Sequence, residues 1–134
     1  AAMFMMTAKT IIKDLAESGM AVNDIFTKAN EKLCENNESG MFVTAWMGIM
    51  DVNTGIMQYA NAGHNPPLLK RADGSFEYLK TRPGFVLAGM EGVRYREGGL
   101  SLCKGDRLFL YTDGVPDATN IEKYVIGELD YFID

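Results

Sequence analysis

Asp113 is the carboxylate whose position in the sequence best suits chemistry. It follows the apolar run 108–111, which predicts a buried strand, and it precedes Gly114, which lets the backbone turn sharply and an ion approach closely. A carboxylate at such a strand end suits a hard divalent cation such as Mg²⁺ or Mn²⁺, which prefers oxygen ligands. The local sequence by itself favours a simple turn, because Asp-Gly is a common turn pair.

His64 is the second candidate, and it is the single histidine of the sequence. It lies in a segment rich in Asn, Gly and Pro, residues 61–67. A histidine in such a loop can act as a general acid or bind a metal. We favour a structural role, in which a neutral imidazole fixes the loop by hydrogen bonds. No second His or Cys lies nearby in the sequence to complete a transition-metal site.

Two helices are expected ahead of these candidates. Apolar residues recur at helical spacing over residues 1–18, and Gly19 follows as a C-cap. A second helix is predicted from residue 22 or 23 to Asn36, with Asn23 as its N-cap. Met3, Met5 and Met6 open the first helix, and such a cluster either fills core space or forms an adaptable binding surface. We favour core filling.

Short strands follow the helices and carry both candidates. Residues 41–51 are apolar on both sides and predict a strand buried on both faces. The remaining predicted strands cover residues 56–60, 68–71, 76–80, 93–97, 100–103 and 107–111, with hairpin turns between several of them. Two helices followed by such strands indicate an α+β fold with largely antiparallel pairing.

Composition excludes several classes of function. The net charge of −5 opposes binding to nucleic acid phosphates. The apolar runs are shorter than the ~20 residues that a membrane-spanning helix needs, so no membrane insertion is expected. Cys34 and Cys103 have no ligand spacing around them, and without a secretory signal they indicate reduced thiols in a cytoplasmic protein.

Four segments in this order and spacing resemble the SpoIIE-type branch of the metal-dependent serine/threonine protein phosphatases, the PPM family. They are residues 41–45, residues 48–55, residues 59–67 and residues 105–115. The resemblance covers residues 1 to about 120. It places two helices resembling the family's switch helices in residues 1–36 and an antiparallel β core in residues 41–120, all within one partial phosphatase domain spanning residues 1–134.

The resemblance implies an α-β-β-α sandwich with antiparallel sheets. It also implies hydrolysis of a phosphoserine or phosphothreonine on a small regulatory protein of the anti-anti-sigma type. In the family, aspartates hold two Mn²⁺ or Mg²⁺ ions that activate the attacking water and clamp the phosphate oxygens. Asp113 matches one of those aspartates, so the resemblance makes it a metal ligand and catalytic residue. The loop of His64 matches a family motif that is not among the metal ligands.

The sequence also departs from the family pattern. The family's earlier aspartates would lie upstream of Ala1, and Asp130 and Asp134 do not reproduce its late acidic pair, so residues 121–134 are not aligned. We therefore expect this chain alone to be weakly active or inactive, and an incomplete sheet with open edges predicts pairing into a homodimer. The alternative is a non-catalytic interaction module that keeps the fold. A generic antiparallel scaffold would not explain four ordered matches.

Overall fold

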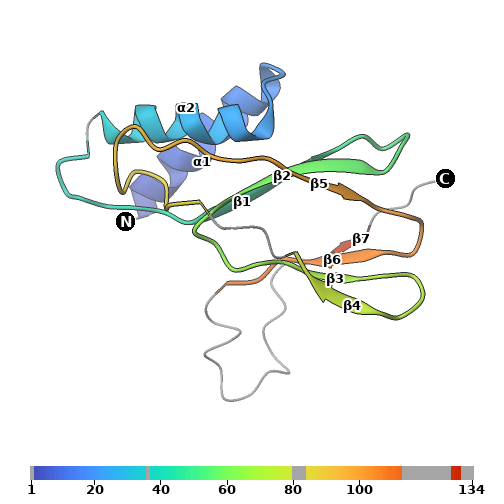
Figure 1. Cartoon of the computed structure of the whole chain (residues 1–134). Coiled ribbons are helices and arrows are strands. Elements are labelled where there is room, and N and C mark those ends of the chain that lie inside the picture. Colours follow the sequence, from blue (N-terminus) through green and yellow to red (C-terminus); the bar gives the residue numbers. More distant parts are fainter. Residues whose placement is uncertain (1, 36, 80–83, 113–127, 131–134) are drawn as a thin grey trace, which may run out of the picture. The chain divides into compact units, whose positions relative to one another are not determined.

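The computed structural model describes residues 2–35, 37–79, 84–112 and 128–130. The chain divides into two compact units, and each is described by itself below. Figure 1 labels the helices and strands. The first unit comprises residues 1–49, 58–64 and 82–99, and the second comprises residues 50–57, 65–81 and 100–134. The described part contains two helices and two β-sheets, which confirms the predicted α+β class with antiparallel sheets.

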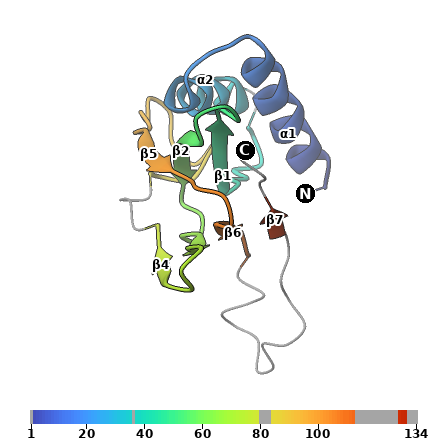
Figure 2. The same cartoon turned by 90° about the vertical axis from the view of Figure 1, so that its right-hand side faces the viewer.

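The two predicted helices are present. Helix α1 spans Ala2–Glu17 and α2 spans Val22–Cys34, and the two helices pack against each other (Figure 2). Gly19 adopts a left-handed φ of 82° just after α1, as expected of a residue that ends a helix. The predicted cap at Asn23 is wrong, because α2 begins one residue earlier and Ala21 occupies the N-cap position without a side-chain hydrogen bond.

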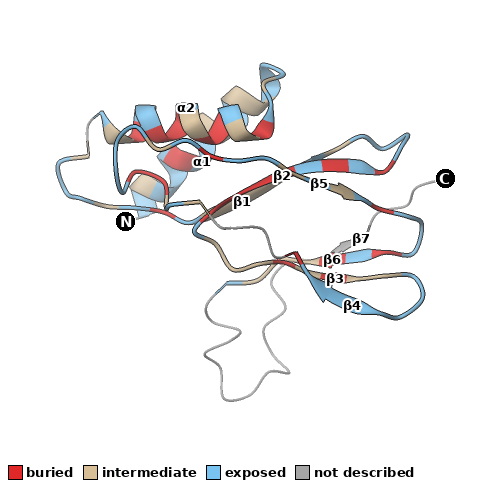
Figure 3. Ribbon diagram, viewed as in Figure 1, coloured by how far each residue is buried: buried red, intermediate tan, exposed pale blue. Residues whose placement is uncertain are grey.

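The core of the first unit gathers on one face of α2. Buried positions recur along that helix, as the red bands in Figure 3 show. The ring of Phe26 meets that of Tyr95 edge to face at 5.8 Å, and Val43 and Leu87 join the same cluster. This spacing of buried residues is that of an amphipathic helix, so the periodicity of the sequence sets which face α2 turns inward.

Helix α1 covers the core less completely. Ala8 is its buried residue, while Met3, Met5 and Met6 are 81%, 54% and 69% exposed. The prediction that these methionines fill core space is therefore wrong. They lie in the first turns of α1, whereas the core is contacted by other residues of that helix: Phe4, Ala8, Ile11, Ile12, Leu15 and Ala16. No helix among the described residues is both long and apolar enough to cross a membrane.

Three strands form one sheet in the order β1-β2-β5: β1 is Ala45–Met50, β2 is Ile56–Ala62 and β5 is Gly98–Ser101. Strand β1 is mostly half-buried, with Ile49 exposed, so the predicted burial of residues 41–51 on both faces is wrong. Strand β1 stands at the end of this sheet and has one neighbouring strand among the described residues, which leaves its residues partly uncovered.

The predicted strand 93–97 is also wrong, since the structure has no strand there. The backbone N–H of Tyr95 donates to Oγ1 of Thr27 on α2 at 3.3 Å instead of to a neighbouring strand. A helix side chain has taken the place that a β partner would fill. Strand β5 corresponds to the predicted strand 100–103, but it begins two residues earlier, at Gly98, and ends at Ser101.

Four strands form the sheet of the second unit in the order β4-β3-β6-β7: β3 is Leu68–Lys70, β4 is Phe76–Tyr78, β6 is Arg107–Phe109 and β7 is Glu128–Asp130. All three pairings are antiparallel. Strands β3 and β4 form the predicted hairpin, with Leu68 opposite Tyr78. Leu69 and Leu108 are opposite each other and fully buried. The strand β7 lies in the segment that could not be aligned from the sequence.

Candidate functional site

The predicted metal ligand Asp113 lies outside the described residues, but the strand that leads to it is described. Strand β6 lies between β3 and β7, so both of its edges are hydrogen-bonded. Leu108 anchors the strand in the core. Tyr111 is half-buried, and burial together with the neighbouring Tyr78 raises the pKa of its phenol. A central strand anchored in this way has its C-terminal end, at Phe109, held in place.

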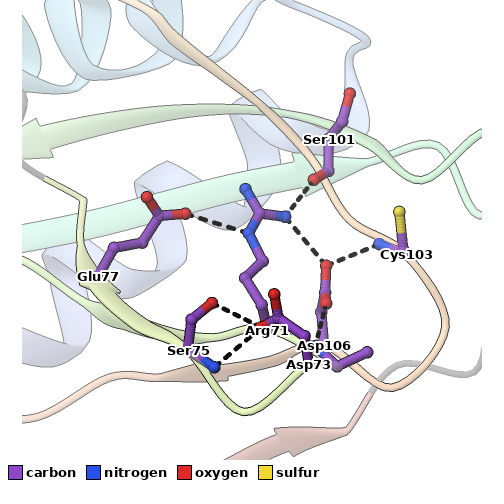
Figure 4. Close-up of polar contacts among 8 residues, drawn as sticks. Arg71, Asp73, Ser75, Glu77, Ser101, Cys103 and Asp106 are labelled. Carbon is purple, nitrogen blue, oxygen red and sulfur yellow. Dashed lines mark hydrogen bonds and ion pairs between the residues drawn. The ribbon is translucent and has the colours of Figure 1, made fainter.

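An ion pair fixes the other end of β6. Asp106 directly precedes the strand, and its carboxylate accepts from Nη1 of Arg71 at 3.0 Å, from the Ala72 N–H at 2.9 Å and from the Cys103 N–H at 2.8 Å (Figure 4). Arg71 also donates to Glu77 at 3.1 Å and to the Ser101 carbonyl at 2.8 Å. One buried carboxylate thus joins the β3–β4 hairpin to the turn before β6.

The hydrogen bonds decide the charge state of Asp106. Its side chain is 3% exposed, and burial alone would raise its pKa. The amide donors of Cys103 and Ala72 and the guanidinium of Arg71 outweigh burial and hold the pKa of Asp106 below its usual value. The carboxylate is therefore ionised near neutral pH. Its oxygens already accept hydrogen bonds from three donors within the chain, which gives Asp106 a structural role.

His64 lies in a tightly hydrogen-bonded turn of the first unit. Asn61, which is 7% exposed, donates from Nδ2 to the His64 carbonyl at 3.0 Å and accepts the His64 N–H on Oδ1 at 2.7 Å. Nδ1 of His64 lies 3.0 Å from Oγ1 of Thr44. Gly63 has a φ of 67° and carries the turn. The arrangement supports the structural role that we favoured, since the imidazole helps to hold its own loop.

The described residues do not bring metal ligands together. Within residues 2–35, 37–79, 84–112 and 128–130, no group of three or more His, Cys, Asp and Glu side chains could hold a metal ion. His64 belongs to the first unit, while the strand leading to Asp113 belongs to the second. Both cysteines are free.

Sequence reasoning missed two buried polar residues that organise these loops, Asp106 and Asn30. Asp106 lies between the predicted strands 100–103 and 107–111, and Asn30 lies within the second predicted helix, but no pattern in the sequence singled out either residue. For Asp106 the available signal was its place between Gly105 and a predicted strand, in a chain that has an arginine in the preceding hairpin. For Asn30 the signal was a polar residue on the otherwise apolar face that includes Phe26 and Leu33.

Comparison with known proteins agrees with this architecture. The family model of stage II sporulation protein E (SpoIIE) matches residues 1–132. The phosphoserine phosphatase RsbU of Bacillus subtilis is 28% identical over 118 residues, which are 87% of this chain and 35% of RsbU. The crystal structure of the RsbU and RsbW domains of Rv1364c from Mycobacterium tuberculosis superposes with a TM-score of 0.75 at 28% identity, over 87% of this chain and 32% of that one.

A second solved structure identifies the class of fold. The PP2C phosphatase domain of SpoIIE from Bacillus subtilis superposes with a TM-score of 0.70 at 17% identity, over 86% of this chain and 35% of that one. The two helices and the antiparallel sheets are therefore those of a PP2C-type, or PPM-type, phosphatase fold, as the sequence predicted. The chain belongs to the SpoIIE family. It spans about a third of the length of the RsbU relative that it matches.

Proposed function

We propose that this chain forms part of a metal-dependent protein phosphatase that removes phosphate from a phosphoserine or phosphothreonine of a regulatory protein. Membership of the SpoIIE family across residues 1–132 carries the proposal, and RsbU, a relative of this chain, is a phosphoserine phosphatase. The substrate class that we propose is an anti-anti-sigma-type regulator in the control of a sigma factor. The acidic chain, with a net charge of −5, gives no support to a nucleic acid substrate.

Asp113 is proposed as a ligand of one of two Mn²⁺ or Mg²⁺ ions. Its support is its place in the sequence, four residues beyond Phe109 at the end of the central strand β6. When bound, such ions would activate a water and neutralise phosphate oxygens. The residues that the structure describes supply no metal site of their own, so their contribution is positional: β3, β7 and the Arg71–Asp106 pair hold β6 in place.

Hydrolysis of a phosphoserine peptide, with and without manganese, tests this proposal in the longer protein that contains this segment. Asp113→Asn should lower manganese-dependent hydrolysis by about 100-fold or more, because a ligand to the activating ion is lost. Asp14→Asn, on the exposed side of α1, is the matched control and should leave the rate unchanged. Unchanged hydrolysis in Asp113→Asn would remove Asp113 from the site.

The chain of residues 1–134 should hydrolyse the same peptide weakly or not at all, since it contains one matched ligand aspartate. Full turnover by this chain would contradict that expectation. If the longer protein binds the phosphorylated regulator tightly but never hydrolyses it, the alternative function is correct, and the domain is a non-catalytic interaction module with a phosphatase-like fold.

Self-association and location complete the proposal. Strand β4 ends its sheet, and Phe76 and Tyr78 on it are 59% and 51% exposed, which offers an apolar edge to a second copy. Sedimentation of the chain and of Tyr78→Lys tests whether a homodimer forms through this edge. A monomer at all concentrations in the unsubstituted chain would oppose a homodimer.

A cytoplasmic location is also proposed. Its support is the sequence, in which the two cysteines indicate reduced thiols.

A further inference from the structure

Asn30 of α2 is a fully buried polar residue that forms hydrogen bonds to Ala88 and Met90, in a segment with a strained backbone. Its Oδ1 accepts the N–H of Ala88 at 2.7 Å, and its Nδ2 donates to the carbonyl of Met90 at 2.9 Å. Between these two bonds Ala88 adopts a φ of 67°, the one positive φ of a non-glycine residue in the part of the chain that the structure describes. Such a conformation persists only where the surroundings hold it.

The same segment, residues 84–90, contacts the turn of His64 on its other side. The N–H of Gly84 donates to the carbonyl of Asn61 at 2.8 Å, where the turn begins. Gly63 lies so close to the segment that a Cβ on it would come within 2.7 Å of Cγ1 of Val86. The segment therefore packs directly against the backbone of the turn.

Residues 84–90 are also connected to Thr44, the residue whose side chain contacts the imidazole of His64. Leu87 and Val43 exchange both backbone hydrogen bonds, at 3.0 and 2.8 Å. The next residue, Thr44, is the one that contacts Nδ1 of His64. Leu87 is thus connected to His64 through the peptide unit between Val43 and Thr44 and the side chain of Thr44.

Tyr95 forms a second connection from α2 to the segment. Its hydroxyl donates to the carbonyl of Val86 at 3.1 Å, while its N–H donates to Thr27 on α2 at 3.3 Å. Both connections start from α2, one turn apart, and both end within residues 84–90. All of these residues belong to the first unit, so the path lies within one compact body.

We propose that Asn30 is a latch that couples the position of α2 to the turn that carries His64. While its two hydrogen bonds hold, Ala88 stays left-handed and Val86 stays against Gly63. A displacement of α2 that breaks them lets Ala88 relax and changes the surroundings of His64. Asn30 acts here as a positioning residue, and the coupling does not depend on the phosphatase activity proposed above.

Amide hydrogen exchange and NMR of the chain test the latch. Asn30→Ala should speed exchange of the Gly84 and Leu87 amides by about tenfold or more, the equivalent of one buried hydrogen bond. It should also shift the ring signals of His64, which are unambiguous because the sequence has a single histidine. The matched control is Asn23→Ala, on the first turn of α2, which should change neither reading.

Two results would overturn the proposal. One is an effect of Asn30→Ala confined to the Ala88 and Met90 region, with unchanged His64 signals and unchanged Gly84 exchange. The other comes from the unsubstituted chain, which serves if Asn30→Ala fails to fold. In the unsubstituted chain, the hydrogen bonds of the Gly84, Leu87 and Ala88 amides should open together. The exchange rates of these three amides should then show the same dependence on urea concentration, below the concentration that unfolds the whole chain. Separate urea dependences, or exchange through global unfolding alone, would exclude a latch.

Discussion

Arg71 and Asp106 form an ion pair at 3.0 Å although 35 positions separate them in the chain. The pair is asymmetric, because the side chain of Asp106 is 3% exposed and that of Arg71 is 32% exposed. Removal of Asp106 should therefore have other consequences than removal of Glu77, the exposed carboxylate that Arg71 also contacts. Without Asp106, the backbone amides of Ala72 and Cys103 lose a buried acceptor, whereas without Glu77 the arginine loses only a contact at the surface.

Asp106→Ala should lower the free energy of unfolding by about 2–4 kcal/mol, because it leaves the amides of Ala72 and Cys103 unpaired and a guanidinium without its buried partner. Urea denaturation followed by circular dichroism measures this loss. Glu77→Ala is the control and should cost less than about 1 kcal/mol, as expected of an exposed pair. Equal losses in the two variants would mean that the buried carboxylate has no special role.

The acid sensitivity of the protein should change in Asp106→Asn. In the folded protein the pKa of Asp106 lies below its ordinary value, so the folded state releases this proton more readily than the unfolded chain. The resulting stabilisation is complete above the unfolded pKa, near 4, and is lost as pH falls through the lower folded pKa.

Unfolding free energies of the unsubstituted chain and of Asp106→Asn, measured at pH 7 and again below pH 4, should therefore converge as the pH falls. A constant difference between the two proteins across this range would show that ionisation of Asp106 does not contribute.

Local periodicity predicted the features that depend on neighbouring residues. Helix α1 and helix α2, the hairpin of β3 and β4, and the start of β6 at Arg107 were all predicted within a few residues. Each is set by the spacing of apolar residues or by turn residues close in the sequence. The α+β class and the family followed from the same segments.

The features that the sequence did not predict depend on distant partners. Asn30 contacts Ala88 and Met90, which are 58 and 60 positions away, and Asp106 contacts Ala72, 34 positions away. Residues 93–97 have a strand-like pattern, but the side chain of Thr27 on α2 accepts the backbone N–H of Tyr95. No window of the sequence contains both members of these pairs, so pattern reasoning cannot weigh them. The metal-ligand role of Asp113 stays a prediction.

Gly63→Ala should destabilise the protein by about 2–4 kcal/mol. The position combines a φ of 67° with a Cβ site 2.7 Å from Cγ1 of Val86, so the substitution adds a steric clash to backbone strain. Gly74→Ala separates the two effects, because Gly74 has a φ of 91° but nothing within 4 Å of its Cβ site. It should cost about 1 kcal/mol. Thermal unfolding compares the stability of the two variants. If Gly63→Ala loses no more stability than Gly74→Ala, residues 84–90 move to accommodate the added Cβ at little cost in free energy.

Tyr95→Phe tests the second connection between α2 and residues 84–90. The variant loses the hydrogen bond from the hydroxyl to the Val86 carbonyl and should cost about 1 kcal/mol at neutral pH. Burial, with a smaller contribution from Cys34, raises the pKa of Tyr95 to about 12, so the folded protein keeps a proton that the unfolded chain loses near pH 10.

This contribution of Tyr95 to stability is present below pH 10 and is lost as the pH rises toward 12. Between pH 8 and pH 11, the free energy of unfolding should decrease more in the unsubstituted chain than in Tyr95→Phe, because phenylalanine cannot ionise. Parallel declines in the two proteins would assign the alkaline loss to other groups. They would leave the Tyr95 hydroxyl with a hydrogen-bonding role at neutral pH alone.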